Sequence, residues 1–411
     1  FISLSTATSS PPKFMYSLCI TKILFLPRFL LTCFPFNKIS IITMHIIVFF
    51  TYGISLNDWS ESGLIDREVL IYKRLIEKYK CNITFITYGD DKDYSFEEFL
   101  HPIKVIPIQT LLNRKINLIN SMFIPFKIKE TIRSADILKS NQFMGSWVAT
   151  MSKILFKKKL LIRTGYDYIK FATEENKSVF KILAAYVLSI FNLIFASRYI
   201  VTSKQDKLFL NKITMQLFKN KIIVIPNWVN VPGKFPDEGR YENRIISVGR
   251  LEKQKNYKDL IISLEGSDIY LDIFGNGSQK KYLEGLAEKH KVNLNIFSNL
   301  SNVELLEKMK RYKIFASTSL YEGNSKVILE AMAMGCLVIT SDIENNQEIV
   351  KNNISGVVYK KDIEELKQKI IFYMNNDTER KELAFSGYEQ IKTINSLNSV
   401  VSLERSLYDE I

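Results

Sequence analysis

The feature that most limits the fold is a pattern of short apolar runs alternating with longer helical stretches, and it occurs twice. In the first half, most of the runs are rich in β-branched residues and are separated by helical patterns. Such runs are typical of parallel strands that helices cover on both faces. We therefore expect a helix over residues 62–79 and strands at residues 45–50, 82–87, 104–108, 136–139, 159–163, 199–202 and 222–225.

A Pro/Gly cluster at residues 226–236 separates the two halves and predicts an interdomain linker. The pattern then restarts with strands expected at 245–249, 270–275, 294–297, 314–317, 337–340 and 356–359. A helix is expected over residues 257–264, and the segment after Asn375 is expected to be helical. The sequence thus predicts an α/β chain of two Rossmann-like, doubly wound domains facing a central cleft, where such sheets bind ligands.

The ends of the chain are assigned separately. We expect domains at residues 44–235 and 236–393. Residues 1–43 open on Phe1, and their apolar stretch, interrupted by Pro27 and Arg28, is too short for a membrane-spanning helix. They are therefore interpreted as a non-native or disordered extension, with Met44 as the start. A poorly formed membrane anchor is the alternative.

Positive charge is concentrated in one part of the chain. Residues 104–240 contain 23 Lys or Arg and 8 Asp or Glu, a net of +15, whereas the whole chain carries +13. An anionic membrane surface, nucleic acid and a merely solvated surface are the three interpretations. No nucleic-acid-binding motif accompanies the charge, so we expect peripheral contact with an anionic membrane and no nucleic-acid partner.

Cysteine and histidine usage narrows the chemistry. The four cysteines are scattered without metal-ligand spacing, which favours a reducing, cytoplasmic location. A peripheral position at the inner face of the cell membrane is compatible with this expectation. With three histidines, a His-rich metal site or a Ser-His-Asp triad is not expected.

Glu322 and Glu330 flank a turn between a predicted strand and a predicted helix. The turn contains Gly323, Asn324 and Ser325. Free backbone N–H groups converge at such a helix start and form an anion site. Two carboxylates beside it could hold hydroxyls on either side of a phosphate, as a nucleotide-sugar requires. Taken alone, the spacing could also arise by chance.

Two basic residues follow the first strand of the second half. Gly249 permits a sharp turn, Arg250 supplies a planar fork for phosphate, and Lys255 supplies a mobile charge. Gly275, after the next strand, lets another group approach the backbone closely. The alternatives are two exposed basic side chains and an ordinary turn.

Taken together, these residues resemble the retaining glycosyltransferases of family 4 (glycosyl transferases group 1), which have the two-domain GT-B fold and a Glu-x7-Glu motif. The resemblance lies between about residues 222 and 360. It rests on residues 224–227, 248–251 with Lys255, 274–277, 321–335, 347–350 and 356–358.

The resemblance implies roles. Arg250 and Lys255 would hold the donor diphosphate and stabilise charge on the leaving nucleotide. Glu322 would hold sugar hydroxyls near the anomeric carbon, and Glu330 the ribose hydroxyls. Donor contacts would also come from Gly249, Gly275, Ser298, Asn299, Gly323, Asn324 and Ser325. No metal and no cofactor is expected, because the two cations and the helix start would take their place.

The first half matches less closely. Many family members carry a His facing the donor sugar, but residues 163–168 contain none. Arg163, Tyr166 or Asp167 would substitute for it. The loop at residues 53–63 would lie over the phosphates or the acceptor, with Trp59 as a platform for a sugar ring. Residues 141–147 would line the acceptor side, and a C-terminal helix at 394–411 would pack back on the first domain.

The sequence therefore predicts a glycosyltransferase (hexosyl transfer) acting on a nucleotide-diphosphate sugar and a glycan or lipid-linked acceptor. Retention of configuration and a role in cell-surface polysaccharide synthesis, such as lipopolysaccharide or capsule, are implied by the resemblance. A GT-B nucleotide-sugar epimerase, a non-catalytic sugar-nucleotide-binding relative and a nucleic-acid binder are the alternatives.

Overall fold

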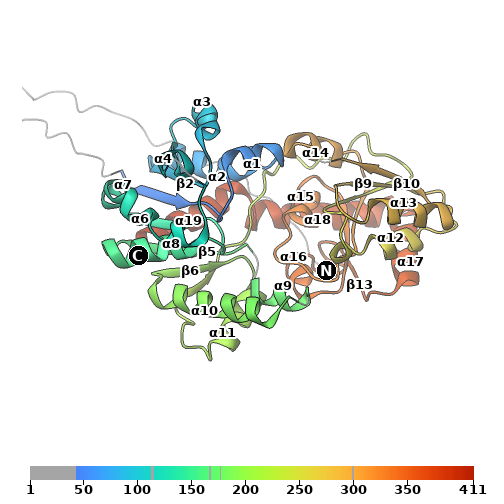
Figure 1. The fold of residues 1–411 in the computed structure, drawn as a ribbon. Helices are drawn as coiled ribbons and strands as arrows, with labels where there is room; N and C mark the ends of the chain where they lie inside the picture. The colour runs from blue at the N-terminus through green and yellow to red at the C-terminus, as the bar shows by residue number, and fades with distance from the viewer. Residues whose placement is uncertain (1–42, 113–114, 166–167, 176, 299) are drawn as a thin grey trace, which may run out of the picture. The chain divides into compact units, whose positions relative to one another are not determined.

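The computed structural model describes residues 43–411 except residues 113–114, 166–167, 176 and 299 (Figure 1). The extension predicted over residues 1–43 therefore lies, apart from its last residue, outside the described part. Within that part the chain builds two parallel sheets, each in its own half of the sequence. This confirms the predicted α/β class with two Rossmann-like domains.

The first sheet has the order β3-β2-β1-β4-β5-β6-β7 and is parallel throughout. Its register places Val48 of β1 between Phe85 of β2 and Lys139 of β4. The strands are β1 (His45–Phe49), β2 (Asn82–Thr87), β3 (Lys104–Pro107), β4 (Ile137–Ser140), β5 (Lys159–Arg163), β6 (Arg198–Val201) and β7 (Ile222–Val224).

The second sheet has the order β10-β9-β8-β11-β12-β13 and is also parallel. Its central strands are almost entirely apolar and buried, as expected for a sheet covered on both faces. The strands are β8 (Arg244–Val248), β9 (Tyr270–Phe274), β10 (Asn293–Phe297), β11 (Ile314–Ser317), β12 (Leu337–Ser341) and β13 (Val357–Tyr359).

Helices cover both sheets. The first domain contains a 3-10 helix, η1 (Asp91–Phe96), and α1 (Leu56–Glu61), α2 (Ile65–Tyr79), α3 (Glu97–Leu100), α4 (Ile108–Leu112), α5 (Leu118–Ser121), α6 (Ile124–Lys127), α7 (Lys129–Ser134), α8 (Ser146–Phe156), α9 (Tyr168–Glu174), α10 (Val179–Phe195) and α11 (Lys204–Ile213). The second half contains η2 (Lys253–Lys255), α12 (Tyr257–Ser263), α13 (Lys280–Lys289), α14 (Asn302–Met309), α15 (Lys326–Ala333), α16 (Glu344–Ile349), α17 (Ile363–Asn375), α18 (Asp377–Ile394) and α19 (Leu397–Glu410).

The last helix belongs to the first core. Val400, Leu407 and Tyr408 of α19 are buried in the same apolar cluster as Leu75 of α2 and Phe85 of β2. The chain thus crosses back at its C-terminal end, and this crossing brings residues far apart in sequence into one interior.

Two segments expected to be loops contain helix. Residues 53–63 include α1, because Ser55 and Asp58 form a reciprocal capping box in which each side chain accepts from the other's backbone N–H. The helix expected at 62–79 is α2, which begins three residues later than predicted, at Ile65, and ends at Tyr79 as predicted. Residues 141–147 end inside α8, which begins at Ser146.

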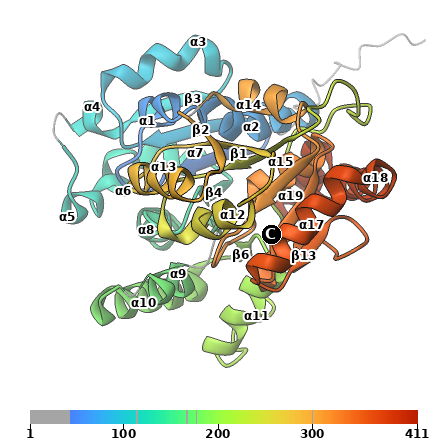
Figure 2. The same cartoon turned by 90° about the vertical axis from the view of Figure 1, so that its right-hand side faces the viewer.

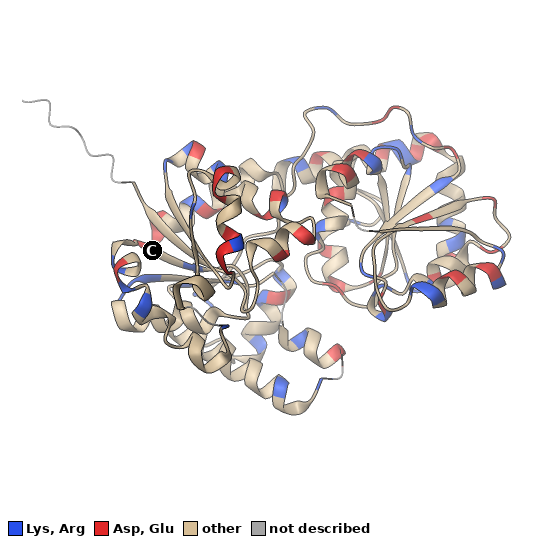
Figure 3. Ribbon diagram, turned by 45° about the horizontal axis from the view of Figure 1, so that its top comes forward, with Lys and Arg blue, Asp and Glu red and all other residues tan. Residues whose placement is uncertain are grey.

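Helices α9, α10 and α11 form a group at the lower side of Figures 1 and 2. In Figure 3 this region is largely tan with scattered blue Lys and Arg positions. Over the described residues, every helix is too short or too polar to cross a bilayer.

Candidate active site

The turn after β11 is held rigidly at the start of α15. The backbone N–H of Asn227 donates to Asn324 Oδ1 at 3.2 Å, and its side-chain Nδ2 donates to the Asn324 carbonyl at 2.7 Å. Asn227 belongs to the linker segment and also accepts from Arg163 Nη2 at 3.2 Å. One asparagine therefore joins the turn, the linker and the first domain, and it positions the free N–H groups at the helix start.

Glu322 and Lys255 form an ion pair. Ser319 Oγ also donates to Glu322 Oε1 at 2.7 Å, and Asn345 Nδ2 donates to the Glu322 carbonyl at 2.8 Å. Lys255 lies at the end of the 3-10 helix η2, which follows β8. The carboxylate and the ammonium group are thus fixed beside each other at the carboxyl ends of neighbouring strands β8 and β11.

The two predicted glycines make this approach possible. Gly249 has φ +150°, and a Cβ there would lie 2.8 Å from Cε of Lys255. A Cβ on Gly275 would lie 2.0 Å from the Gly249 carbonyl oxygen. A larger residue at Gly249 would strain the backbone and displace the Lys255 side chain, and one at Gly275 would collide with the Gly249 backbone.

Residues of both domains line a cavity of about 660 Å³ around this ion pair. Arg250 is exposed at its edge and donates to Gln254 Oε1 at 3.3 Å. The first domain contributes Arg67, Gly165, Tyr168, Phe171, Glu175 and Lys177, and the second contributes Gly249, Arg250, Gln254, Lys255, Glu322, Gly323, Asn324, Ser325, Lys326 and Val327. We call this space the large cavity.

Glu330 lies in α15 and is only 2% exposed. Its Oε1 accepts from Asn302 Nδ2 at 2.8 Å and lies 3.4 Å from Arg67 Nη1 of the first domain. The carboxylate is therefore partnered across the domains. The assignment of Glu330 to ribose hydroxyls stays a prediction. A ribose hydroxyl would have to bind the carboxylate alongside Asn302 and Arg67, or displace one of them.

The predicted base-facing segment is only partly described. Phe297 stacks on Phe274 at 4.8 Å between ring centroids, and Ser298 follows it in an exposed position. Asn299 lies outside the described residues, as do Tyr166 and Asp167 of the predicted sugar-facing loop. Their assignments stay predictions.

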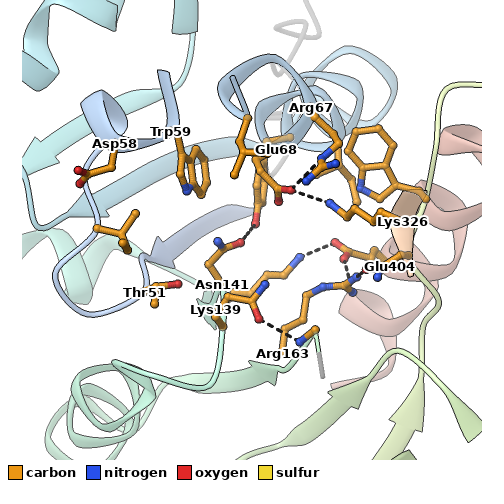
Figure 4. A pocket seen from close by; sticks show the side chains of 18 residues that line it. Thr51, Asp58, Trp59, Arg67, Glu68, Lys139, Asn141, Arg163, Lys326 and Glu404 are labelled. Atoms are coloured by element: carbon orange, nitrogen blue, oxygen red, sulfur yellow. Dashed lines mark hydrogen bonds and ion pairs between the residues drawn. The ribbon is translucent and has the colours of Figure 1, made fainter. Parts of the chain in front are cut away.

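A smaller cavity of about 390 Å³ adjoins the large one and shares Arg67, Gly165 and Lys326 with it (Figure 4). Its lining comes mainly from loops after β1, β4 and β5 and from α2 and α19. Predicted residues Trp59 and Arg163 lie here and not in the large cavity.

Charged side chains in the smaller cavity form two groups. In the first, Glu404 of α19 lies between Lys139 Nζ, at 2.6 Å, and Arg163 Nη1, at 3.5 Å. All three are at least nine-tenths buried. Burial by itself would raise the pKa of Glu404, but the charges of Lys139 and Arg163 outweigh it and hold the pKa below its usual value.

In the second group, Glu68 of α2 lies 2.6 Å from Lys326 Nζ and 3.4 Å from Arg67 Nε. Burial acts to raise the pKa of Glu68, yet Lys326 and Arg67 lower it to about 2. Lys326 is the first residue of α15, so this pair connects the first domain to the helix start of the second.

Trp59 is 7% exposed and stacks on Phe50 with 4.3 Å between ring centroids. One ring face is therefore covered by the core, because α1 turns that face inward. The remaining edge lines the smaller cavity. A role as a sugar platform stays a prediction.

Sequence reasoning missed several residues of these cavities. Lys326 was part of the quoted motif but received no role, and Glu404 was not noticed at all. A signal existed for Glu404: it is the only charged residue on the otherwise apolar stripe Leu397, Val400, Val401, Leu407 and Tyr408 of α19. Arg67 and Glu68 had no comparable signal, because their partners lie in the other domain.

Two parallel Rossmann-like domains enclose a cavity lined by an Arg, a Lys, a Glu and a helix start, and solved glycosyltransferase structures share this two-domain GT-B fold. A solved structure of Anabaena HepE in complex with UDP and glucose aligns with a TM-score of 0.70 at 14% identity, covering 90% of this chain and 100% of that chain. A glycosyltransferase from Rickettsia africae aligns with a TM-score of 0.64 at 18% identity, covering 89% and 98%. At these identities the likeness shows the fold alone.

Residues 234–390 match the family model described as glycosyl transferases group 1. An uncharacterized glycosyltransferase of Methanocaldococcus jannaschii is 30% identical over 203 residues, which are 47% of this chain and 55% of the relative. The poly(ribitol-phosphate) alpha-N-acetylglucosaminyltransferase of Staphylococcus aureus is 24% identical over 195 residues, 46% of this chain and 39% of the relative. The chain thus spans about half, or less, of the length of these curated relatives.

Proposed function

We propose that this chain is a glycosyltransferase that moves a sugar from a nucleotide-diphosphate sugar to a glycan or lipid-linked acceptor with retention of configuration. The observation that carries this proposal is the large cavity, in which Lys255, Arg250 and Glu322 surround the helix start of α15. The match of residues 234–390 to the group 1 glycosyltransferase model supports it.

The proposed chemistry follows from the charges. As the bond from the anomeric carbon to the phosphate oxygen breaks, negative charge grows on the diphosphate and positive charge on the sugar ring. Lys255, Arg250 and the backbone N–H groups at the start of α15 would stabilise the diphosphate, so that no metal is required. Glu322 would stand next to the ring. The acceptor oxygen forms the new bond, and its proton passes to the departing phosphate oxygen on the same face.

The free protein holds Lys255 in an ion pair with Glu322. We propose that the donor phosphate shares Lys255 when it binds, and that Glu322 then turns its free oxygen toward sugar hydroxyls. In the free protein, the attraction between the two charges offsets part of the cost of removing them from water. Both groups nevertheless line the large cavity, where a substrate can reach them.

We further propose that the acceptor enters through the smaller cavity and that the enzyme works at the inner face of the cell membrane in cell-surface polysaccharide synthesis. The excess of positive charge over residues 104–240 supports contact with an anionic membrane. The cavity's position beside Gly165 and Lys326, which line both spaces, supports the acceptor path.

The proposal is tested in two stages. A thermal-shift screen of UDP, GDP, ADP and dTDP sugars should raise the midpoint of unfolding with one base class, because a ligand that binds only the folded state stabilises it. The selected donor is then incubated with and without EDTA, and its products are separated. Slow release of free nucleoside diphosphate in both samples supports the proposal. Accumulation of an epimeric nucleotide-sugar would instead support an epimerase, and binding without turnover a non-catalytic relative.

A further inference from the structure

Helix α10 buries one face against the first domain, and its opposite face is apolar although it is exposed. Ala185 and Leu193 face the interior of the first domain. On the opposite side, Phe180, Leu183 and Val187 are 79%, 56% and 59% exposed. A helix at the surface of a globular protein normally presents polar residues outward. The outer face of α10 therefore has the composition of a surface that something apolar covers.

The exposed apolar surface extends beyond α10. A shallow groove of about 430 Å³ on this helix is lined only by Phe180, Leu183, Ala184, Val187, Leu188 and Phe191. Helix α8 packs against both α10 and α6 and adds exposed Ile154 and Leu155. Further exposed apolar side chains lie on α5, on α6 and on or after α11: Leu118, Ile119, Phe123, Phe126, Leu208, Met215 and Leu217. Large apolar patches of this kind mark interaction surfaces.

The charges around this surface select its partner. Between residues 177 and 234 the chain has nine Lys or Arg and one acidic residue, Asp206, which is buried. Lys181, Lys212 and Lys219 are exposed. A second copy of the chain would bring these cations against one another, which disfavours a symmetric dimer through this face. Anionic lipid headgroups complement the cations, and the acyl boundary complements the apolar side chains.

We propose that the outer face of α10, with the exposed apolar residues of α5, α6, α8 and α11, docks on an anionic lipid bilayer. Because the inner face of α10 packs on the protein, the helix lies in the membrane interface and does not cross the bilayer. This surface adjoins the catalytic region: α9 precedes α10, and Phe171 and Lys177 line the large cavity. A docked enzyme could take a lipid-linked acceptor from the bilayer. That step rests on the proposed function, whereas the docking itself does not.

Flotation with lipid vesicles tests the docking. Wild-type protein should float with vesicles of phosphatidylglycerol and phosphatidylcholine and remain at the bottom with phosphatidylcholine alone. Leu183→Asp with Val187→Asp should reduce binding by at least about tenfold, because two charges enter the acyl boundary. The matched control is Phe372→Asp on α17, where the phenylalanine is 47% exposed in the other domain. It should bind as the wild type does.

Each other outcome overturns the docking surface. Equal flotation of the double variant and the wild type would place membrane contact elsewhere, and absence of flotation of the wild type would exclude it. If the wild type is a dimer that the double variant dissociates, the face joins two copies. If a variant lacking residues 1–42 floats but the full chain does not, that segment covers the face. Thermal shift with the selected donor on the same samples separates the two proposals, since donor binding without flotation would contradict only the docking.

Discussion

The two domains use charge in different ways. In the second domain, Lys255 and Glu322 line an open cavity and come from two short motifs that lie on neighbouring strand ends. In the first domain, Lys139 and Arg163 pair with Glu404, and the lysine and the glutamate are 265 residues apart and almost fully buried. The open pair is arranged to exchange partners with a substrate, whereas the buried group holds the last helix onto the first sheet. From this difference we expect the Lys255–Glu322 pair to act in the reaction and the Lys139–Arg163–Glu404 group mainly to stabilise the fold.

The largest effect should come from breaking the buried group. Glu404→Leu leaves the buried Lys139 and Arg163 without their carboxylate, so we expect a loss of about 3–5 kcal/mol in the free energy of unfolding. Urea denaturation measures it. Glu410→Gln, an exposed change on the same helix, should change stability by less than about 0.5 kcal/mol.

Adding Lys139→Met to Glu404→Leu sharpens this prediction. Removing both charges should recover part of the lost stability, because Arg163 is then the one cation of the group that still lacks its carboxylate. If the double variant is as unstable as the sum of the single variants, the interaction between the two charges is not the source of the effect.

Breaking the Lys255–Glu322 ion pair should lower turnover and leave the stability of the fold almost unchanged. Lys255→Ala should reduce donor turnover by about 100-fold to 1,000-fold, because the developing charge on the leaving diphosphate loses its closest cation. Its midpoint of thermal unfolding should stay near that of the wild type. An unstable variant with normal turnover per folded molecule would reverse the comparison between the two domains.

An intermediate effect is expected at Glu68, which joins the domains. Its pKa of about 2 lies below the ordinary carboxyl value, so it adds stability above about pH 4.5 that is lost as the pH falls toward 2. Glu68→Gln should therefore cost about 2 kcal/mol at neutral pH, and the cost should shrink at about pH 3.5. Urea unfolding at both pH values measures it, and a difference that does not change with pH would exclude the ion pair with Lys326 as its cause.

The smallest effect should come from Asn227, which contacts the turn but no reacting group. Asn227→Ala removes side-chain bonds to Asn324 and Arg163, and we expect donor affinity to fall by about threefold to tenfold through a less ordered helix start. Asn375→Ala, an exposed change at the end of α17 in the second domain, serves as the control. An unchanged affinity would mean that the turn keeps its conformation without this anchor.

Local sequence signals are sufficient for the fold and for residues that the structure brings together in the large cavity. Strands β5 and β11 lie at their predicted bounds because each has an apolar centre that can be recognised in the sequence without knowing its partner strands. The large cavity likewise combines Gly249, Lys255 and Glu322, whose motifs are short and contiguous.

Local signals failed where the partner is remote. Arg67 and Glu330 meet across 263 residues, and nothing in either segment specifies the other. One local signal also escapes the usual pattern: the capping box of α1 is completed by Asp58 and not by the more usual Glu or Gln. Arg163 was predicted as a sugar contact, but its surroundings depend on Asn227 and Glu404, which only the folded chain brings together.

The most direct test of the central claim is calorimetric titration of the nucleoside diphosphate selected in the donor screen into three proteins. Wild type and Lys253→Ala should bind it equally, because Lys253 is exposed and outside the large cavity. Lys255→Ala should bind it at least about tenfold more weakly, having lost a charge-assisted contact to phosphate. Equal affinity in all three proteins would contradict the account, because the diphosphate would then bind away from the Lys255–Glu322 pair.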